Sequence, residues 1–317
     1  MPDIEINRIS KSYGQTKALN DISFSVEKGE LFGLIGPDGA GKSTLFRMLT
    51  TLLIPDEGEA TVIGLDTVKD YRKIRREVGY MPGKFSLYPD LSVEENLNFF
   101  ATVFNTTVAD NYHLIRDIYE QIAPFKTRRA GNLSGGMKQK LALCCALVHE
   151  PKVLFLDEPT TGVDAVSRRE FWEMLKRLKQ QGITILVSTP YMDEASLCER
   201  IALIQTGNIL KIDTPERIVQ SYDKPLLAVR SRDFYALLQD LRQAEFTERV
   251  EPFGEYLHLT LRPATPSEVS LDRESPFRQP LRDTLDGIRT YLEERGHQDV
   301  VVERASATVE DVFLSLM

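Results

Sequence analysis

The sequence has few cysteines and no long apolar run. Three of its 317 residues are cysteine (Cys144, Cys145 and Cys198), and an odd number with two adjacent excludes a disulfide framework. This usage fits a reducing compartment. No stretch reaches the roughly 18–20 apolar residues of a membrane-spanning helix, and the N-terminus lacks the basic and apolar regions of a signal peptide. We therefore expect any work at a membrane to proceed through a partner protein.

Positive charge is also in deficit. There are 39 Lys and Arg against 47 Asp and Glu, a net charge of −8, which argues against a surface built mainly to wrap nucleic acid. The four histidines show no metal-ligand spacing, so a zinc site is not expected. With 42 % hydrophobic and 27 % charged residues, the chain has ordinary globular composition and is too long for one average domain.

The first part of the chain alternates strand and helix patterns. Ile22, Phe24 and Val26 alternate with polar residues as in a half-buried strand. The first helical pattern places Leu45, Met48, Leu49 and Leu52 on one face. Short apolar runs typical of buried strands cover 31–35, 153–156 and 183–187. The runs 201–205 and 209–212 flank Gly207-Asn208 and predict a hairpin. This alternation predicts an α/β domain over residues 1–224 with a largely parallel sheet and a helical insertion at about 84–150.

Residues 225–317 have a different pattern. They predict a small α+β accessory domain without a catalytic constellation, for which a structural or dimerising role is the favoured interpretation. The expected strands cover 226–230, 256–261 and 300–302, and the expected helices cover 233–242, 281–295 and 309–316. A polar loop containing proline is expected over 263–276.

One segment has the spacing of a phosphate-binding loop, G-x-x-x-x-G-K-[ST]. Glycines let backbone N–H groups approach phosphate oxygens, and the helix that begins here adds its positive N-terminal end. Lys42 is expected to reach the β- and γ-phosphates, and the Ser43 hydroxyl to ligate Mg²⁺. We therefore predict a nucleotide site formed by Gly36, Pro37, Asp38, Gly39, Ala40, Gly41, Lys42, Ser43 and Thr44.

Two carboxylates, Asp157 and Glu158, follow the buried run 153–156. They are expected at the carboxyl edge of the sheet, where α/β proteins bind their ligands. Asp157 would hold Mg²⁺ directly or through water. Glu158 would polarise the attacking water as the general base. Alone, an ordinary strand end would be the simpler interpretation, but the phosphate loop in the same chain favours a catalytic one.

A second anion-binding device lies at Ser134, Gly135 and Gly136. Ser134 is a good N-cap, and the two glycines expose N–H groups and the helix dipole to an anion. Because residues 36–44 already cradle the chain's own nucleotide, a second device suggests that two subunits share each nucleotide.

With these motifs in this order, residues 3–215 resemble the ATP-binding subunits of ABC transporters. The signature takes the form Leu133–Met137, and Thr161–Asp164 occupies the place of the D-loop. The resemblance implies a P-loop NTPase core with a helical subdomain, and a sandwich dimer with MgATP at each interface. It implies that Ser134, Gly135 and Gly136 contact the partner's ATP and that Tyr13 stacks on adenine.

A finer resemblance points to the export branch whose permease is a separate chain, often multidrug exporters. It rests on residues 85–88, 91–97 and 308–313. It implies an ATPase on the cytoplasmic face of the membrane, bound to a transmembrane permease that sets the substrate. One rival is a soluble ABC ATPase without transport, which the single phosphate loop and the lack of sustained heptads disfavour. Another is a non-catalytic regulatory subunit.

Two positions depart from the family pattern. Gly83 stands where the family has a glutamine, and Pro190 stands where it has a switch histidine. Glycine has no side-chain ligand, and proline has neither a ring nitrogen nor an N–H to offer a phosphate. We therefore predict that the chain's own site binds MgATP but hydrolyses it slowly, which favours a heterodimer with a complete ATPase chain. A working homodimer that tolerates both substitutions is the alternative.

Overall fold

The computed structural model describes residues 1–84, 86–262 and 281–317, and the chain divides into two compact units. One unit contains Met1–Ile218 and Phe313–Met317, and the other contains Val219–Val312. The second unit begins earlier than the expected residue 225. The reason is local: the Tyr222 hydroxyl lies 2.7 Å from Thr260 Oγ1, and Lys224 Nζ lies 2.5 Å from Glu248 Oε1.

A six-stranded sheet forms the centre of the first unit. The apolar runs predict five of its strands, whereas the strand at Val78–Met81 was not predicted. Its order is β10-β9-β3-β8-β7-β6. Every neighbouring pair is parallel except the hairpin of β9 and β10. The strands are β3 (Leu31–Ile35), β6 (Val78–Met81), β7 (Val153–Asp157), β8 (Thr184–Thr189), β9 (Arg200–Gln205) and β10 (Asn208–Asp213). The carboxyl ends of β3, β7 and β8 therefore meet at one edge.

A second, antiparallel sheet was not predicted. Its order is β2-β1-β4-β5, with β1 (Ile4–Tyr13), β2 (Thr16–Val26), β4 (Glu57–Val62) and β5 (Leu65–Asp66). The predicted half-buried strand at 22–26 is the end of β2. The alternation in β1 is interrupted because its register shifts between Ile6 and Ile9, where Arg8 has a positive φ of 53°. Because of such a bulge, the apolar residues of the strand no longer alternate with polar residues at every second position.

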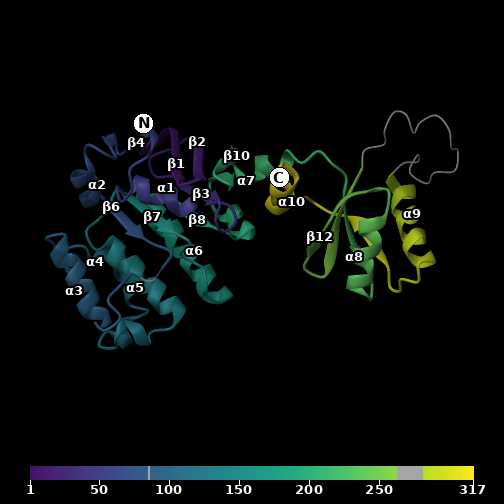
Figure 1. The fold of residues 1–317 in the computed structure, drawn as a ribbon. Helices are drawn as coiled ribbons and strands as arrows, with labels where there is room; N and C mark the ends of the chain where they lie inside the picture. Colours follow the sequence, from purple (N-terminus) through teal and green to yellow (C-terminus); the bar gives the residue numbers. More distant parts are fainter. Residues whose placement is uncertain (85, 263–280) are drawn as a thin grey trace. The chain divides into compact units, whose positions relative to one another are not determined.

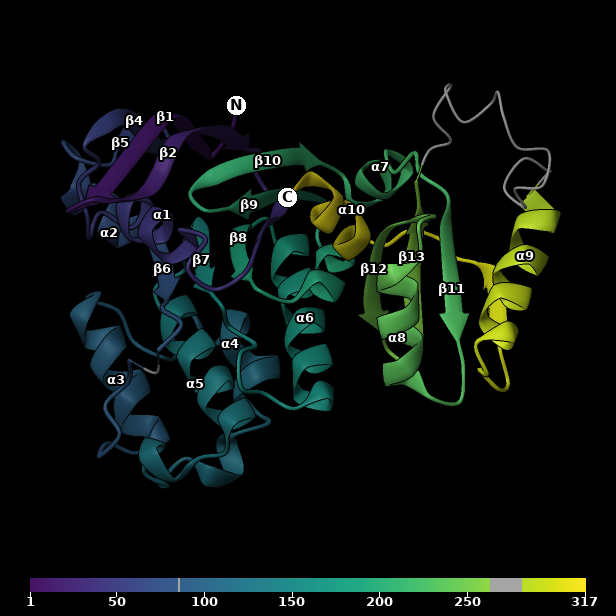
Figure 2. The same cartoon turned by 45° about the vertical axis from the view of Figure 1, so that its right-hand side comes forward.

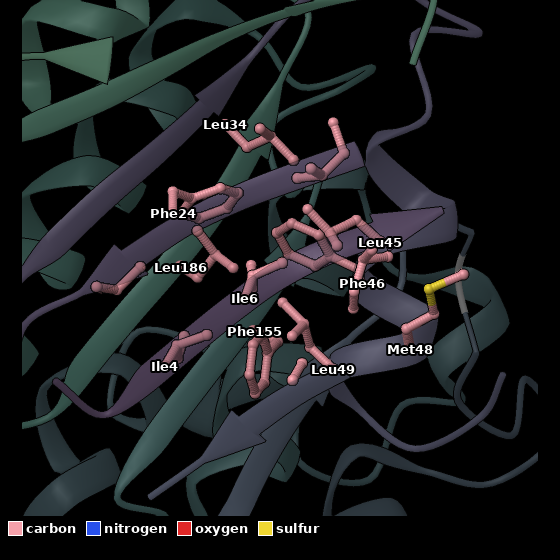
Figure 3. Close-up of a cluster of buried hydrophobic side chains, with 14 of the residues drawn as sticks. Ile4, Ile6, Phe24, Leu34, Leu45, Phe46, Met48, Leu49, Phe155 and Leu186 are labelled. Atoms are coloured by element: carbon pink, nitrogen blue, oxygen red, sulfur yellow. The ribbon is translucent and has the colours of Figure 1, made fainter. Parts of the chain in front are cut away.

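Helix α1 (Lys42–Leu49) lies in the core between these two sheets (Figure 3). Phe46 meets Phe155 of β7 edge-on, with 6.1 Å between ring centroids. The expectation that Leu52 shares the buried face was wrong. Thr51 has a φ of 65° just past the helix, and Leu52 is 57 % exposed. Other members of the cluster are Ile4, Ile6, Phe24, Leu34, Leu45, Met48, Leu49 and Leu186.

The insertion consists of three helices joined by turns and short 3₁₀ segments. They are α3 (Val93–Val103), α4 (Tyr112–Tyr119) and α5 (Gly135–Leu147), and Figures 1 and 2 show them grouped together. A capping box of Ser92 and Glu95 begins α3. The other helices of this unit are α2 (Tyr71–Glu77) and α6 (Ala165–Gln180), with α7 (Pro215–Gln220) at the division between the units.

The second unit has the order β-α-β-β-α-β followed by a helix. It contains β11 (Leu226–Arg230), α8 (Phe234–Gln243), β12 (Thr247–Phe253), β13 (Tyr256–Leu261), α9 (Leu281–Glu294), β14 (Val301–Arg304) and the beginning of α10 (Val309–Leu316), whose residues from Phe313 onward belong to the first unit. The antiparallel sheet order β12-β13-β11-β14 makes this a ferredoxin-like arrangement. Strand β12 was missed because Pro252 is atypical of a strand. The expected loop at 263–276 lies outside the described residues.

A candidate nucleotide site at the carboxyl edge of the parallel sheet

The predicted phosphate loop connects β3 to α1, as its spacing requires. Lys42 begins the helix and its side chain is only 2 % exposed. Its Nζ donates to the carbonyl oxygens of Gly36 at 2.8 Å and Pro37 at 2.9 Å, so the ammonium is held under the loop. Ser43 is exposed on the first turn, and Thr44 beside it is half-buried.

The loop's glycines have different roles. A Cβ on Gly36 would overlap the Ile204 carbonyl oxygen in β9, and one on Gly41 would overlap the Ala18 carbonyl oxygen in β2. A Cβ on Gly39, which has a φ of 79°, would meet nothing within 4 Å. Two glycines therefore let the loop sit directly on neighbouring strands, a role the motif alone does not reveal.

The two predicted carboxylates lie at the end of β7. Asp157 is buried and accepts a 2.7 Å hydrogen bond from Ser188 Oγ in β8. Glu158 has a φ of 51°, a conformation uncommon outside glycine, and its backbone N–H donates to the Ser188 carbonyl oxygen at 3.1 Å. Ser188 thus fixes the Asp157 carboxylate and the backbone of Glu158, a role that sequence reasoning missed. A lone polar residue at the end of an apolar strand is the signal that could have revealed it.

An ion pair joins the phosphate loop to the acidic strand end. Glu158 Oε1 lies 3.0 Å from Lys42 Nζ. The Glu158 side chain is partly exposed whereas that of Lys42 is not, so the carboxylate borders solvent above a buried ammonium. The two motifs, 116 residues apart in sequence, therefore form one site.

Both departures from the expected pattern lie at this edge. A Cβ on Gly83 would stand 3.1 Å from the Asp157 carbonyl oxygen. Pro190 follows Thr189, the last residue of β8, and the Thr189 carbonyl oxygen accepts from Gly36 N at 3.2 Å. Gly83 and Pro190 therefore both lie next to residues expected to hold nucleotide and metal, and neither residue has a side-chain hydrogen-bonding group.

Tyr80 is a further group that the sequence reasoning missed. It lies in β6, next to β7. Burial, and then the charge of Asp157, raise the pKa of Tyr80 to about 12. The phenol therefore stays neutral at physiological pH and can donate a hydrogen bond beside the acidic strand end.

Tyr13 and the signature residues lie elsewhere in the unit. Tyr13 is 48 % exposed at the hairpin of β1 and β2, whose second strand passes Gly41 at Ala18. Ser134 caps α5 by accepting from Met137 N at 3.4 Å. The nearest neighbours of a Cβ on Gly135 and Gly136 come from the segment 162–167. The signature therefore packs against the D-loop segment of its own chain.

The residues present suit MgATP. The site combines a helix N-terminus, a buried lysine and the oxygen groups of Ser43 and Asp157, and Mg²⁺ prefers oxygen ligands. In the part of the chain that the structure describes, no helix has the length and apolarity that crossing a membrane requires.

Comparisons with known proteins show which family this chain is similar to. A family model described as ABC transporter matches residues 19–161. The probable multidrug ABC transporter ATP-binding protein YbhF of Escherichia coli is 43 % identical over 67 % of this chain, but the chain spans only 37 % of that relative's length. The Nod factor export ATP-binding protein I of Bradyrhizobium diazoefficiens is 33 % identical, with 99 % of this chain and 95 % of the relative covered.

Solved structures give the same result. The ATP-binding subunit of an ABC transporter superposes with a TM-score of 0.63 at 27 % identity, covering 69 % of this chain and 92 % of that one. The ATP-binding cassette MJ0796, dimeric in a post-hydrolysis state with ADP and phosphate, superposes with a TM-score of 0.60 at 25 % identity, covering 67 % and 98 %.

Proposed function

Because this chain belongs to the ABC transporter family, as an ATP-binding protein, we propose that it binds MgATP at residues 36–44 and drives a membrane permease for export. It does so as a dimer with itself or with a second ATPase chain. The observation that carries this proposal is the Lys42–Glu158 ion pair, which places the phosphate loop and the acidic strand end in one site.

Each residue of that site has a separate task. Lys42 moves from Glu158 to the β- and γ-phosphates, while the loop's backbone N–H groups and the α1 N-terminus bind the phosphate oxygens. Glu158, released from the ion pair, polarises the attacking water. Ser43 and Asp157 would hold Mg²⁺, which would supply positive charge to neutralise the transferred phosphoryl group. Tyr13 stacks on the adenine.

This site hydrolyses ATP slowly. At its edge, Gly83 offers no side-chain ligand to Mg²⁺, and Pro190 offers no hydrogen-bond donor to a phosphate. One lost donor aimed at developing charge typically lowers the rate by about 10²–10³. The partner-facing residues Ser134, Gly135 and Gly136 are intact, so this chain still completes a fast site on a second, complete ATPase. A homodimer that tolerates both substitutions is the second candidate, favoured by the retained Glu158.

Force reaches the permease through an exposed apolar patch formed by Tyr88, Phe99 and Val103. Tyr88 and Phe99 are exposed, and their rings pack edge-on with 4.8 Å between the centroids. Val103 is also exposed and lies in α3 with Phe99. An exposed apolar patch of this kind suits a protein partner. The buried Asn96 side chain accepts from Tyr88 N and donates to the Tyr88 carbonyl oxygen, both at 3.0 Å, so α3 and this patch move as one body.

Export as the direction is supported by the relatives named for multidrug and Nod factor export. The chain then works on the cytoplasmic face of the membrane, and the permease sets the substrate. A soluble ABC ATPase without transport is the competing function. Co-purification of the tagged chain with a membrane protein from detergent-solubilised cells separates the two.

The first experiment measures ATP affinity by calorimetry beside single-turnover hydrolysis. The wild-type chain is expected to bind ATP at micromolar concentration with almost no turnover, and Lys42→Met to bind none. Gly83→Gln combined with Pro190→His is expected to raise turnover at least tenfold. Turnover of several per second by the wild-type chain alone, with no gain in the double variant, would refute the slow-site proposal. It would leave a homodimer as the working state.

A further inference from the structure

Glu194 is a buried carboxylate that takes no part in the nucleotide binding and hydrolysis proposed above. Glu194 is 1 % exposed and belongs to the 3₁₀ segment Met192–Leu197 that follows Pro190. Its Oε2 accepts from Thr189 Oγ1 at 2.5 Å and from Thr160 Oγ1 at 3.1 Å. A single oxygen of Glu194 therefore joins two threonines that are 29 residues apart.

Those threonines belong to the two loops that border the nucleotide site. Thr160 is two residues beyond Glu158, and Thr189 directly precedes Pro190. The Thr189 hydroxyl also accepts from Tyr191 N at 3.1 Å, and the Thr189 carbonyl oxygen accepts from Gly36 N. Any change in the Glu194 bonds therefore acts on the general-base loop, the Pro190 loop and the start of the phosphate loop.

A third segment contacts the same carboxylate. Arg168, in the first turns of α6 after the D-loop, places Nε 3.8 Å from Glu194 Oε1 and stacks its guanidinium over the Tyr191 ring at 4.4 Å. Neither Arg168 Nε nor Glu194 Oε1 has a hydrogen-bond partner in the described structure, although both are buried. These two atoms therefore meet as a buried ion pair without a hydrogen bond, an arrangement that is weak evidence for a purely stabilising role.

We propose that Glu194 is a positioning residue that sets the separation between the loop of Glu158 and the loop of Pro190, a proposal that rests on the function proposed above. Position 190 has no histidine that could contact a phosphate. The hydrogen bonds of Glu194 to Thr160 and Thr189 therefore hold the two loops at a fixed separation. Misplacement of a catalytic group by about 1 Å can lower a rate by roughly a hundredfold, so this joint controls hydrolysis without touching ATP.

The test uses the full-length chain and two substitutions of similar size. Glu194→Gln keeps an oxygen that accepts from both threonines, whereas Glu194→Leu keeps the volume and removes the acceptor. Thr160→Val removes one donor with almost no change of shape and serves if Glu194→Leu fails to fold. Glu173→Gln is the matched control, because Glu173 is an exposed glutamate that pairs only with Lys176 on α6 in the described structure.

Amide hydrogen exchange of the nucleotide-free chain is the first readout. Glu194→Leu is expected to speed exchange at least tenfold in residues 158–163 and 189–195, including Tyr191, while the core strands β3 and β7 keep their protection. Glu194→Gln should stay within threefold of wild type. Unchanged exchange in Glu194→Leu, or equally faster exchange across the whole unit, would overturn the proposal.

Kinetics give the second readout. ATP affinity by calorimetry should change less than threefold in Glu194→Leu, whereas single-turnover hydrolysis in the assembled dimer should fall at least tenfold and be restored in Glu194→Gln. An equal loss of affinity and rate would mean that Glu194 only supports the fold. If the wild-type chain binds no ATP, the proposed function fails, but the exchange comparison still decides the role of Glu194.

Discussion

Replacing Gly36 by alanine tests whether the phosphate loop is seated by backbone packing. Gly36 lacks a positive φ, so alanine could adopt its backbone without strain. The added methyl would nevertheless overlap the Ile204 carbonyl oxygen and stand 2.9 Å from Ile204 Cγ2. Ile204 cannot yield easily, because β9 pairs with β3 on one side and β10 on the other.

The magnitude follows from that overlap. Overpacking a rigid interior typically costs about 1–3 kcal/mol, and backbone obstruction belongs at the upper end. Gly39→Ala is the matched control: its methyl meets nothing, but its φ of 79° costs about 1–2 kcal/mol. For a unit of this size each kcal/mol lowers the melting temperature by about 2–4 °C. We expect Gly36→Ala to lose about 6–12 °C or more, and Gly39→Ala clearly less.

Calorimetric melting of the nucleotide-free chain measures both variants under one buffer. Omitting ATP keeps changes in ligand affinity out of the comparison. If Gly36→Ala melts within 2 °C of wild type, or above Gly39→Ala, then the loop does not depend on contact with β9, and the steric reasoning is refuted.

Three other predictions concern different parts of the chain. Glu158→Gln should keep ATP binding but lower the already slow single-turnover rate of hydrolysis at least a hundredfold, so that dimers persist in MgATP on size exclusion; a rate equal to wild type would remove Glu158 as the base. Burial lowers the pKa of His149 in the folded chain. Below about pH 6.5 the unfolded chain therefore binds a proton there more readily, and the free energy of unfolding should fall between pH 7.5 and pH 5.5. In His149→Gln the urea midpoint should fall less between pH 7.5 and pH 5.5 than it does in wild type. An equal fall in both proteins would contradict this prediction. Leu259→Ala, in the core of the second unit, should lose about 2–5 kcal/mol and expose residues 219–312 to protease before the first unit.

The sequence reasoning worked where the signal is local. Short apolar runs predicted β3, β7 and β8 because a strand buried on both faces must be apolar throughout. The phosphate loop and the acidic strand end were predictable because each occupies consecutive residues. The structure places them in one site, as the sheet-edge argument expected.

What the sequence could not predict depends on distant partners. The need for glycine at position 36 comes from Ile204, and the fixing of Asp157 comes from Ser188 in another strand. Strands β1 and β12 were missed for a different reason, since a bulge and a proline disturb the alternation that marks a strand.

Because α1 lies between two sheets, the stability of the folded protein depends on the concentration of ATP in the cell. A ligand that binds only the folded state adds about 2.7 kcal/mol of stability at a hundred times its dissociation constant. Because the helix that carries Lys42 also carries Phe46 and Leu49 in the main core, nucleotide bound at its first turn opposes unfolding of the whole first unit. A cell depleted of ATP would then lose this protein to proteolysis faster.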